Sequence, residues 1–431
     1  MIFPDEMKKL KKIAIVGGTI WGNRGAEAML ATVIGRIRLH HPTAEFFVFS
    51  YYPEKDRELI SRPDISILSG TPAALVFNHF LAALLIKGLG LFHIVPPAKG
   101  FFRSAIALKN VDLLLDIGGI TFSDGREKFL PFNILTIWPA MILGVPVVKL
   151  AQAVGPFDHR INRTVARHFL SRCQHIFVRG DQSASFIANL SLPKDIAEPA
   201  ADIAFIYESV FTLSSENETR IQTLLDRISE EKRNGKKIIV FSPSILVDRK
   251  LRKKGTDYPS IFLSAIEHLK TDDYFFIFMP NSTRDGSKKK HNNDLLLITE
   301  IKEVFLSEDF SREKDGSVEW IDFDINTASI RAIVSSCDLL VTSRYHAMIS
   351  GLALSIPTIV IGWGHKYNET MQAFDLSEYV MGISQDHFDL LPTIRETLTG
   401  SEEIKKRLDK NLPEIIALAE NQFQYIDRMF Q

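Results

Sequence analysis

Short runs of consecutive apolar residues recur along this chain and alternate with stretches of helical pattern. Strands that are apolar at successive positions, and not only at every second one, are typical of sheets covered on both faces. Helical stretches between such strands predict βα crossovers and parallel sheets. A first set of predicted strands comprises Lys12–Val16, Glu45–Ser50, Leu113–Ile117, Val145–Ala151, Ile176–Val178 and Ile203–Ile206.

A polar helical stretch from Ser214 to Gly235 separates this set from a second one. We therefore expect an α/β protein with two Rossmann-like domains, residues 1–210 and 211–400, whose parallel sheets face each other across a cleft. The helices predicted for residues 401–431 would be able to pack back on the first domain. A chain of 431 residues agrees with two domains, because one core seldom serves that length. The second set of predicted strands comprises Lys237–Ser242, Tyr274–Met279, Trp320–Phe323, Leu339–Thr342 and Thr358–Ile361.

Composition excludes several classes of protein. Hydrophobic residues make up 45% of the chain, which excludes a disordered protein. Lys and Arg (51) nearly balance Asp and Glu (52), so the long-range positive field of a globally basic nucleic-acid binder is missing. The two cysteines, Cys173 and Cys337, exclude a disulfide scaffold and fit buried thiols in a reducing compartment.

The N-terminal segment predicts a cytoplasmic protein. Its basic residues, from Lys8 to Lys12, are followed by only four apolar residues before the pair Gly17-Gly18. A signal peptide needs an apolar stretch of ~7–15 residues after its basic start. The short apolar run is therefore interpreted as a first strand.

The most apolar window runs from Ala73 to Pro97. A membrane-spanning helix needs ~20 uninterrupted apolar residues, and Asn78, His79 and Lys87 interrupt this window. We therefore expect one buried or interfacial helix followed by a loop. A helix of the core or of a pocket wall is one interpretation. The alternative is peripheral contact of residues 73–103 with the inner face of a membrane, because phenylalanines and basic residues are mixed there.

A buried strand that ends in polar residues occurs more than once. Residues 337–346 read Cys-Asp-Leu-Leu-Val-Thr-Ser-Arg-Tyr-His, and residues 111–119 read Val-Asp-Leu-Leu-Leu-Asp-Ile-Gly-Gly. Arg179 and Arg344 each follow a predicted strand, at the carboxyl edge of one sheet or the other. Taken alone, each arginine fits a surface ion pair. If the two edges face each other, both guanidinium groups enter one cleft and suit a small ligand with two anionic ends.

His346 follows Arg344 by two residues, at a predicted strand–helix junction. A histidine in a cleft can act as a general acid or base near neutral pH. The alternative is a side chain that caps the following helix. With Arg344 beside it, we favour catalysis.

Glycine-containing loops follow several predicted strands. Glycines let backbone N–H groups approach an anion, and a helix N-terminus adds a favourable partial charge. The first loop, which contains Gly22, Asn23 and Arg24, matches neither the dinucleotide fingerprint nor a P-loop. No metal site is expected, because the His and Cys residues lack ligand spacing. Further glycines of this kind are Gly118, Gly119 and Gly155.

Several of these segments resemble the polysaccharide pyruvyl transferase family. The resemblance spans roughly residues 12–385 and leaves out the apolar segment 72–104 and the C-terminal helices. Its most specific parts are the Arg-Tyr-His and Lys-Tyr motifs and the Gln-x-x-Gly-Pro-Phe run. It rests on Gly22-Asn23-Arg24-Gly25-Ala26-Glu27-Ala28, Asp116-Ile117-Gly118-Gly119, Ala151-Gln152-Ala153-Val154-Gly155-Pro156-Phe157, Val178-Arg179, His291-Asn292-Asn293-Asp294, Ser343-Arg344-Tyr345-His346 and Gly362-Trp363-Gly364-His365-Lys366-Tyr367.

The resemblance implies a fold like the two-Rossmann glycosyltransferase B type, with phosphoenolpyruvate as co-substrate and no cofactor. Such enzymes convert two sugar hydroxyls into a pyruvate ketal and release phosphate. Arg179 and Arg344 would hold the anionic groups of the donor, and His346 would act either as the acid that protonates the enol methylene or as the base for the sugar hydroxyl. An acidic residue often follows the first arginine in the family, whereas Gly180 follows it here, so its ion-pair partner is left open. Residues implied to contact the donor or acceptor are Gly22, Asn23, Arg24, Gly118, Gly119, Gln152, Gly155, Lys366 and Tyr367.

The resemblance and the predicted cleft together favour a cytoplasmic pyruvyl transferase that acts on a cell-surface polysaccharide or its lipid-linked precursor. Two alternatives stay open at this point. One is a nucleotide-sugar-dependent glycosyltransferase of the same architecture, since fold does not fix chemistry. The other is a non-catalytic protein that binds carbohydrates or anions.

Overall fold

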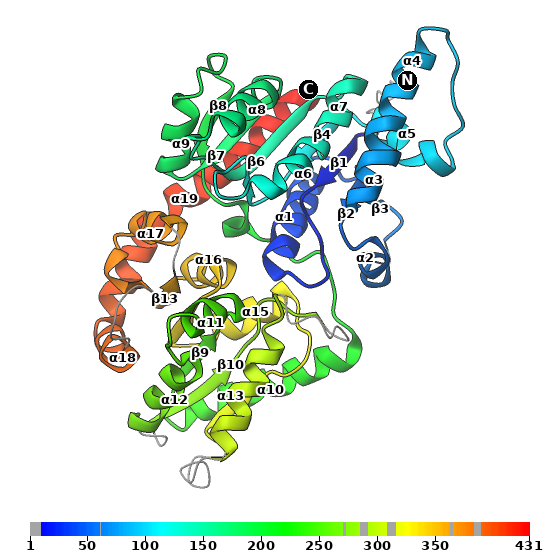
Figure 1. The fold of residues 1–431 in the computed structure, drawn as a ribbon. Coiled ribbons are helices and arrows are strands. Elements are labelled where there is room, and N and C mark those ends of the chain that lie inside the picture. The colour runs from blue at the N-terminus through cyan, green and yellow to red at the C-terminus, as the bar shows by residue number, and fades with distance from the viewer. Residues whose placement is uncertain are drawn as a thin grey trace, which may run out of the picture. The chain divides into compact units, whose positions relative to one another are not determined.

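The computed structural model describes residues 10–60, 62–269, 273–284, 292–307, 316–362, 365–382 and 389–431. These residues divide into two compact units (Figure 1). The first unit holds the described residues up to Ile20, then Met29–Ile203 and Leu418–Gln431. The second holds Trp21–Ala28 and Ala204–Ala417. Each unit is built on its own sheet.

The first unit is built on a parallel sheet of eight strands in the order β3-β2-β1-β4-β6-β7-β8, with β5 beside β6. Residues at successive positions are buried, as in β6, where all eight are inaccessible. Helices on both faces account for this burial, as the sequence pattern predicts. The strands are β1 (Lys12–Val16), β2 (Glu45–Ser50), β3 (Ile65–Ser69), β4 (Leu113–Asp116), β5 (Ile120–Thr121), β6 (Val147–Val154), β7 (His175–Arg179) and β8 (Ala197–Ala200).

The second unit is built on six parallel strands in the order β11-β10-β9-β12-β13-β14. Its core contains the fully buried phenylalanines of β9 and β10. The strands are β9 (Lys237–Ser242), β10 (Tyr274–Phe278), β11 (Val318–Trp320), β12 (Leu339–Thr342), β13 (Thr358–Gly362) and β14 (Val380–Gly382).

The strand order reverses once in each sheet, between β1 and β4 in the first and between β9 and β12 in the second. Open α/β sheets bind ligands outside the carboxyl ends of their strands, at this switch point. Gly118 and Gly119 follow β4, and Arg344 follows β12. The topology therefore places both segments where each sheet is expected to bind a ligand.

The helices connect successive strands. Those that lie wholly or mostly in the first unit are α1 (Arg24–His40), α2 (Pro53–Leu59), α5 (Arg103–Lys109), α6 (Leu130–Leu135), α7 (Trp138–Leu143), α8 (Arg160–Leu170) and α9 (Asp181–Ala188), together with one continuous helix made of α3 (Pro72–Ala74), the π-helical η1 (Leu75–Leu81) and α4 (Ala82–Gly90). Those of the second unit are α10 (Ser215–Arg233), α11 (Ile245–Arg252), α12 (Tyr258–His268), α13 (Leu295–Ser307), α15 (Thr327–Ser335), α16 (Tyr345–Ala353), α17 (His365–Gln372) and α18 (Leu390–Thr399).

A single helix, α19 (Ser401–Phe430), ends the chain. Its residues up to Ala417 group with the second unit and those from Leu418 with the first. In the first unit, Asn421 Nδ2 donates to Glu198 Oε1 at 3.0 Å and Gln422 Nε2 to the Ala201 carbonyl at 2.8 Å. These bonds hold the helix end beside β8.

One predicted strand is wrong. Residues Ile203–Ile206 form a 3₁₀ turn, η4, and the last strand of the first sheet is β8 instead. All four residues of η4 are buried, and a short buried apolar run cannot be assigned to strand or helix by its pattern alone. The strand predicted at Trp320–Phe323 lies earlier, at β11. The two cysteines are buried free thiols, as predicted, and burial raises the pKa of Cys173 to about 12.

Candidate active site

Arg344 stands at the N-terminal boundary of α16, directly after β12 and Ser343. One guanidinium nitrogen forms an ion pair with Asp294, and the other donates to Asn292 Oδ1 at 2.8 Å. Asp294 is fully buried, and its carboxylate also accepts N–H bonds from Ile245 (3.1 Å) and Ser282 (2.9 Å). The acid is thus fixed by backbone, and it orients the guanidinium at the switch point of the second sheet.

His346 lies in the first turn of α16 and is partly buried. Its imidazole lies against Gly25: a Cβ built on Gly25 would be less than 3.0 Å from three atoms of the ring. Real Cβ atoms do not approach other atoms so closely, so any side chain at this position would displace the imidazole. The loop predicted to bind an anion after β1 therefore makes room for the candidate catalytic histidine.

Arg24 precedes Gly25 and is buried. Its guanidinium pairs with Glu27 and with Asp324 Oδ1 (2.8 Å), and donates to Thr283 Oγ1 at 3.1 Å. Burial raises the pKa of Glu27, and the Arg24 charge opposes that shift. These bonds fix the start of α1 to the loops after β10 and β11, which positions Gly25.

Asn23 and Gly22 complete this loop. Asn23 Oδ1 accepts N–H bonds from Gly25 (3.1 Å) and Ala26 (3.3 Å), as an N-cap does. The Gly22 carbonyl accepts a bond from Ser282 Oγ at 2.7 Å. The structure gives Gly22, Asn23 and Arg24 positioning roles, and their contact with substrate stays a prediction.

Two buried tyrosines hold Ser343 from either side. The Tyr258 hydroxyl forms a hydrogen bond with the Ser343 hydroxyl, and the Tyr367 hydroxyl donates to the Ser343 carbonyl at 3.2 Å. Burial raises the pKa of Tyr367 to about 12, so this phenol is neutral near pH 7. Lys366 Nζ lies 4.4 Å from the centre of the Tyr345 ring. Ser343 and Tyr258 were not predicted, whereas Lys366 and Tyr367 were, and both lie on α17 in this unit.

Arg179 ends β7 in the first unit. Its guanidinium pairs with the buried Asp202 and donates to the Gly119 carbonyl at 3.0 Å. Asp202 therefore supplies the ion-pair partner that the sequence left open. The bond to Gly119 joins two residues that were predicted independently. Binding of one ligand by Arg179 and Arg344 together stays a prediction.

Beneath the Gly118-Gly119 turn, Lys149 is fully buried and forms an ion pair with Asp116. The other oxygen of Asp116 accepts the Gly118 N–H at 2.9 Å. Gln152 Nε2 donates to the Asp116 carbonyl at 3.0 Å, and Gln152 Oε1 accepts from Thr121 at 2.6 Å. Gln152, predicted as a substrate contact, is thus engaged in fixing the turn.

Of the predicted glycines of the first unit, Gly155 is required by close approach, whereas Gly119 is not. A Cβ on Gly155, which has a positive φ of 77°, would lie 2.6 Å from the Phe186 ring. A Cβ on Gly119 would meet nothing within 4 Å, so this position is open.

Some residues of the motifs that resemble the family cannot be placed. Trp363, Gly364 and His291 lie outside the described residues, as does the side chain of His365.

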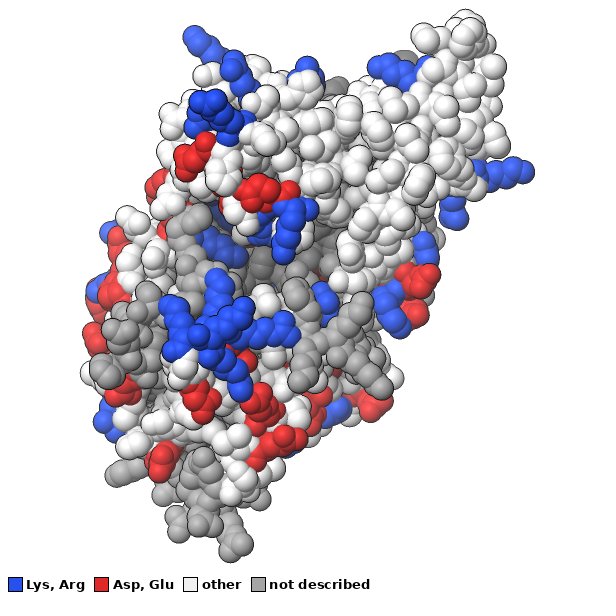
Figure 2. Space-filling view, viewed as in Figure 1, with Lys and Arg blue, Asp and Glu red and all other residues white. Residues whose placement is uncertain are grey.

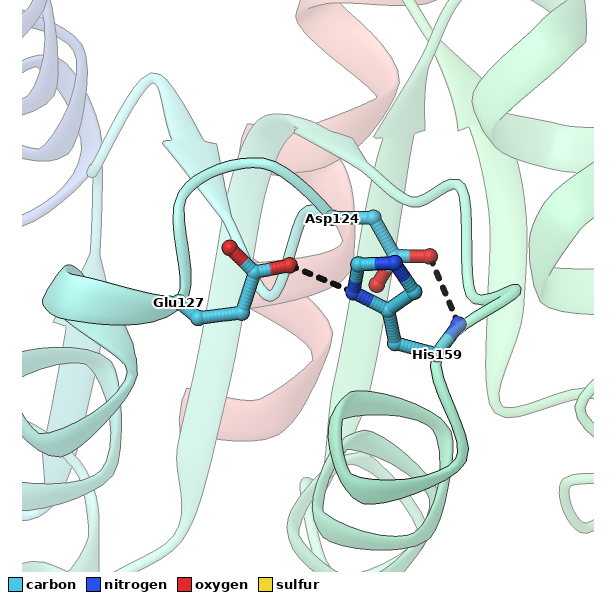
Figure 3. Close-up of side chains that lie close together, drawn as sticks. All are labelled: Asp124, Glu127 and His159. Atoms are coloured by element: carbon cyan, nitrogen blue, oxygen red, sulfur yellow. Dashed lines mark hydrogen bonds and ion pairs between the residues drawn. The ribbon is translucent and has the colours of Figure 1, made fainter.

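A group of possible metal ligands lies elsewhere in the first unit, at Asp124, Glu127 and His159 (Figure 3). His159 Nδ1 is 2.7 Å from Glu127 Oε1, and both side chains are largely exposed. Asp124 accepts the His159 N–H at 2.9 Å and the Asn162 amide at 2.7 Å. Because N–H donors already occupy the aspartate, the group serves to hold the start of α8, and we assign it no metal.

Comparison with known proteins gives the family of this chain. The family model described as polysaccharide pyruvyl transferase matches residues 23–365. The amylovoran biosynthesis protein AmsJ of Erwinia amylovora is 22% identical over 409 residues, which cover 92% of this chain and 94% of that protein. The chain belongs to the polysaccharide pyruvyl transferase family and is an enzyme of this kind.

Solved structures establish the fold. A UDP-N-acetylglucosamine 2-epimerase superimposes with a TM-score of 0.58 at 12% identity, over 97% of this chain and 96% of that one. The epimerase of Neisseria meningitidis, solved with UDP-GlcNAc, gives 0.54 at 14% identity, over 97% and 99%. At such identities the likeness concerns the fold alone. The predicted architecture of two parallel-sheet α/β domains, like glycosyltransferase B, is confirmed.

Proposed function

We propose that this enzyme transfers a pyruvyl group from phosphoenolpyruvate to two hydroxyls of one sugar, forming a ketal and releasing phosphate. The acceptor is a sugar of a cell-surface polysaccharide or of its lipid-linked precursor. The observation that supports this best is the pairing of an oriented arginine, Arg344, with His346 at the carboxyl end of β12. The transfer of a pyruvyl group follows from the family to which the chain belongs, whereas the identities of the donor and the acceptor are our proposal.

Arg344 suits an anionic donor. A guanidinium carries five N–H donors in a planar fork that matches a carboxylate or phosphate. The bonds to Asp294 and Asn292 engage one hydrogen on each terminal nitrogen. A second hydrogen on each is left to bind an anion, while Asp294 keeps the plane of the fork fixed.

His346 supplies proton transfer. Protonation of the enol methylene makes the central carbon electrophilic, and a sugar oxygen bonds to that carbon. The second hydroxyl then bonds to the same carbon as the bond to the phosphate oxygen breaks. Of the two hydroxyl protons released, one balances the new methyl group and the other leaves with phosphate. His346 acts either as the acid for the methylene or as the base for a hydroxyl.

The test is phosphate release from phosphoenolpyruvate in the presence of candidate glycans, both soluble and lipid-linked. We expect release only when an acceptor is present, together with a pyruvylated glycan detected by mass spectrometry. The rival glycosyltransferase would consume a nucleotide sugar and leave phosphoenolpyruvate untouched. Turnover that depends on a nucleotide-sugar donor would overturn the proposal.

A further inference from the structure

The helix Pro72–Gly90 and the segment after it present an apolar surface on the first unit. Of the eighteen large apolar side chains that are exposed among the described residues, ten lie between Val76 and Phe101. Leu91, Phe92 and Val95 are 78%, 74% and 85% exposed. Soluble proteins seldom leave so many apolar side chains together in water, and such a patch marks an interaction site. We call this the apolar surface.

The opposite face of the same helix packs against the rest of the first unit. Ala82 and Ile86 pack on Ala105 of α5, and the Phe80 ring lies 4.5 Å from that of Trp138 on α7. His79, which interrupts the apolar window in the sequence, points inward and bonds to the Ser69 carbonyl at 2.8 Å. His79 therefore does not divide the exposed face.

Charge around the apolar surface has one sign. No Asp or Glu occurs between Ile65 and Val111, whereas Lys87, Lys99, Arg103 and Lys109 do, and all four are exposed. Figure 2 shows this end of the first unit as uncharged, with Lys and Arg at its margin and no acidic side chain on the apolar part. An apolar surface with a basic rim complements a bilayer that carries anionic headgroups.

We propose that the apolar surface docks the enzyme onto an anionic membrane, with the helix Pro72–Gly90 lying in the plane of the headgroups. The helix is long and apolar enough for a spanning segment, by length and composition only. A spanning helix, however, would have to leave α5 and α7, which its inner face covers. Docking in the plane needs no such rearrangement: Leu91, Phe92 and Val95 enter the acyl boundary, and the basic rim meets the phosphates.

The test is cosedimentation of the full-length chain with vesicles, without donor or acceptor, so that its result does not depend on the proposed reaction. Vesicles of phosphatidylcholine alone are compared with vesicles that also contain phosphatidylglycerol. We expect binding to the anionic vesicles that weakens as salt rises from about 0.01 to about 1 M, which shortens the Debye length from ~30 to ~3 Å. The variant Leu91→Ser/Phe92→Ser is expected to bind at least ~10-fold less well.

Removal of rim charges, by Lys99→Gln and Arg103→Gln, is expected to weaken binding about fivefold each. Two matched controls lie elsewhere on the first unit. Ile161→Ser changes a side chain that is 76% exposed, and Lys194→Gln removes an exposed charge. Both are expected to bind as the wild type does.

Three results would overturn the proposal. The first is equal sedimentation with neutral and anionic vesicles, or none with either. The second is a wild-type oligomer that becomes monomeric in Leu91→Ser/Phe92→Ser, which would assign the apolar surface to a second copy of the chain. The third is bound protein that resists extraction by alkaline carbonate, as a spanning helix would.

Discussion

His346 occupies the space that a side chain on Gly25 would need. The two residues lie far apart in the sequence, in the first turn of α1 and in the first turn of α16. Gly25→Ala is therefore expected to push the imidazole aside and lower turnover ~10²-fold, as small misplacements of catalytic groups do. Phosphate release measures the effect.

The matched control for that change is Gly400→Ala, in the same unit, where a Cβ would meet its nearest neighbour at an ordinary 3.4 Å. It is expected to keep wild-type turnover. If Gly25→Ala shows normal turnover and a normal midpoint of thermal unfolding, the close approach of Gly25 to His346 does not matter for catalysis.

His346→Gln is expected to bind phosphoenolpyruvate normally but to turn over ~10²-fold more slowly, as for loss of a general acid or base. The pH profile distinguishes the two roles. If His346 is the acid, turnover in the wild type falls as pH rises and the histidine loses its proton. If it is the base, turnover falls as pH decreases. Whichever limb His346 causes is expected to disappear in the variant, and unchanged turnover would exclude His346 from the mechanism.

Arg344→Lys keeps the charge beside Asp294 but loses the planar fork. We expect the KM for phosphoenolpyruvate to rise ~10-fold or more, with little change in stability. Arg344→Ala leaves the buried Asp294 without its partner, and is expected to lower the free energy of unfolding by ~3–5 kcal/mol. Urea unfolding and donor-binding calorimetry separate the two effects. Equal affinity of wild type and Arg344→Lys for the donor would count against the proposed clamp.

Lys149→Met removes the partner of Asp116 beneath the Gly118-Gly119 turn. An uncompensated buried carboxylate is expected to cost ~3–5 kcal/mol of unfolding free energy. Lys55→Met serves as the control, because the pair of Lys55 and Glu58 is exposed and contributes little to stability. The same denaturation midpoint for both variants would show that the buried pair stabilises nothing.

His79 predicts a pH dependence of stability. Burial lowers its pKa to about 4, below the value of 6.5 that it has when unfolded. The unfolded chain therefore binds the proton first, so stability that is present above pH 6.5 is lost as pH falls towards 4. The linkage amounts to about 3 kcal/mol, at 1.36 kcal/mol for each pKa unit.

Unfolding free energies measured from pH 7 to pH 4.5 check this. His79→Gln, which can still donate to the Ser69 carbonyl, is expected to show a shallower decline than the wild type. The exposed His93 provides the control, since His93→Gln is expected to leave the slope unchanged. Equal slopes for wild type and His79→Gln would contradict the assignment.

Most strands could be predicted because their apolar runs are long and uninterrupted. β8 could not, since Ala197–Ala200 contains Glu198 and Pro199, which are compatible with an edge strand but do not predict one. The buried η4 was mistaken for that strand. His79 could not be placed from the sequence either. In the sequence it is a polar residue within an apolar window, and only the packing of the helix shows that its side chain points inward.

The positions of Arg344 and His346 at a strand end followed from the pattern, because parallel strands share a carboxyl edge. Their partners did not. Asp294 precedes Arg344 by fifty residues, and no local spacing links the two. The sequence indicated Gly25 as part of a ligand loop, whereas its role in making space for an imidazole exists only once α1 and α16 have formed.

Neither compact unit is one continuous stretch of chain. Residues Trp21–Ala28 interrupt the first unit and complete the second, and Leu418–Gln431 return to the first. During synthesis, the N-terminal half must wait for the last turns of α19 before Gln422 can reach Ala201. The C-terminal half, expressed alone, would lack Gly25 beside His346. A fragment cut at the middle of the chain would therefore lack residues of its own unit, whichever half is kept.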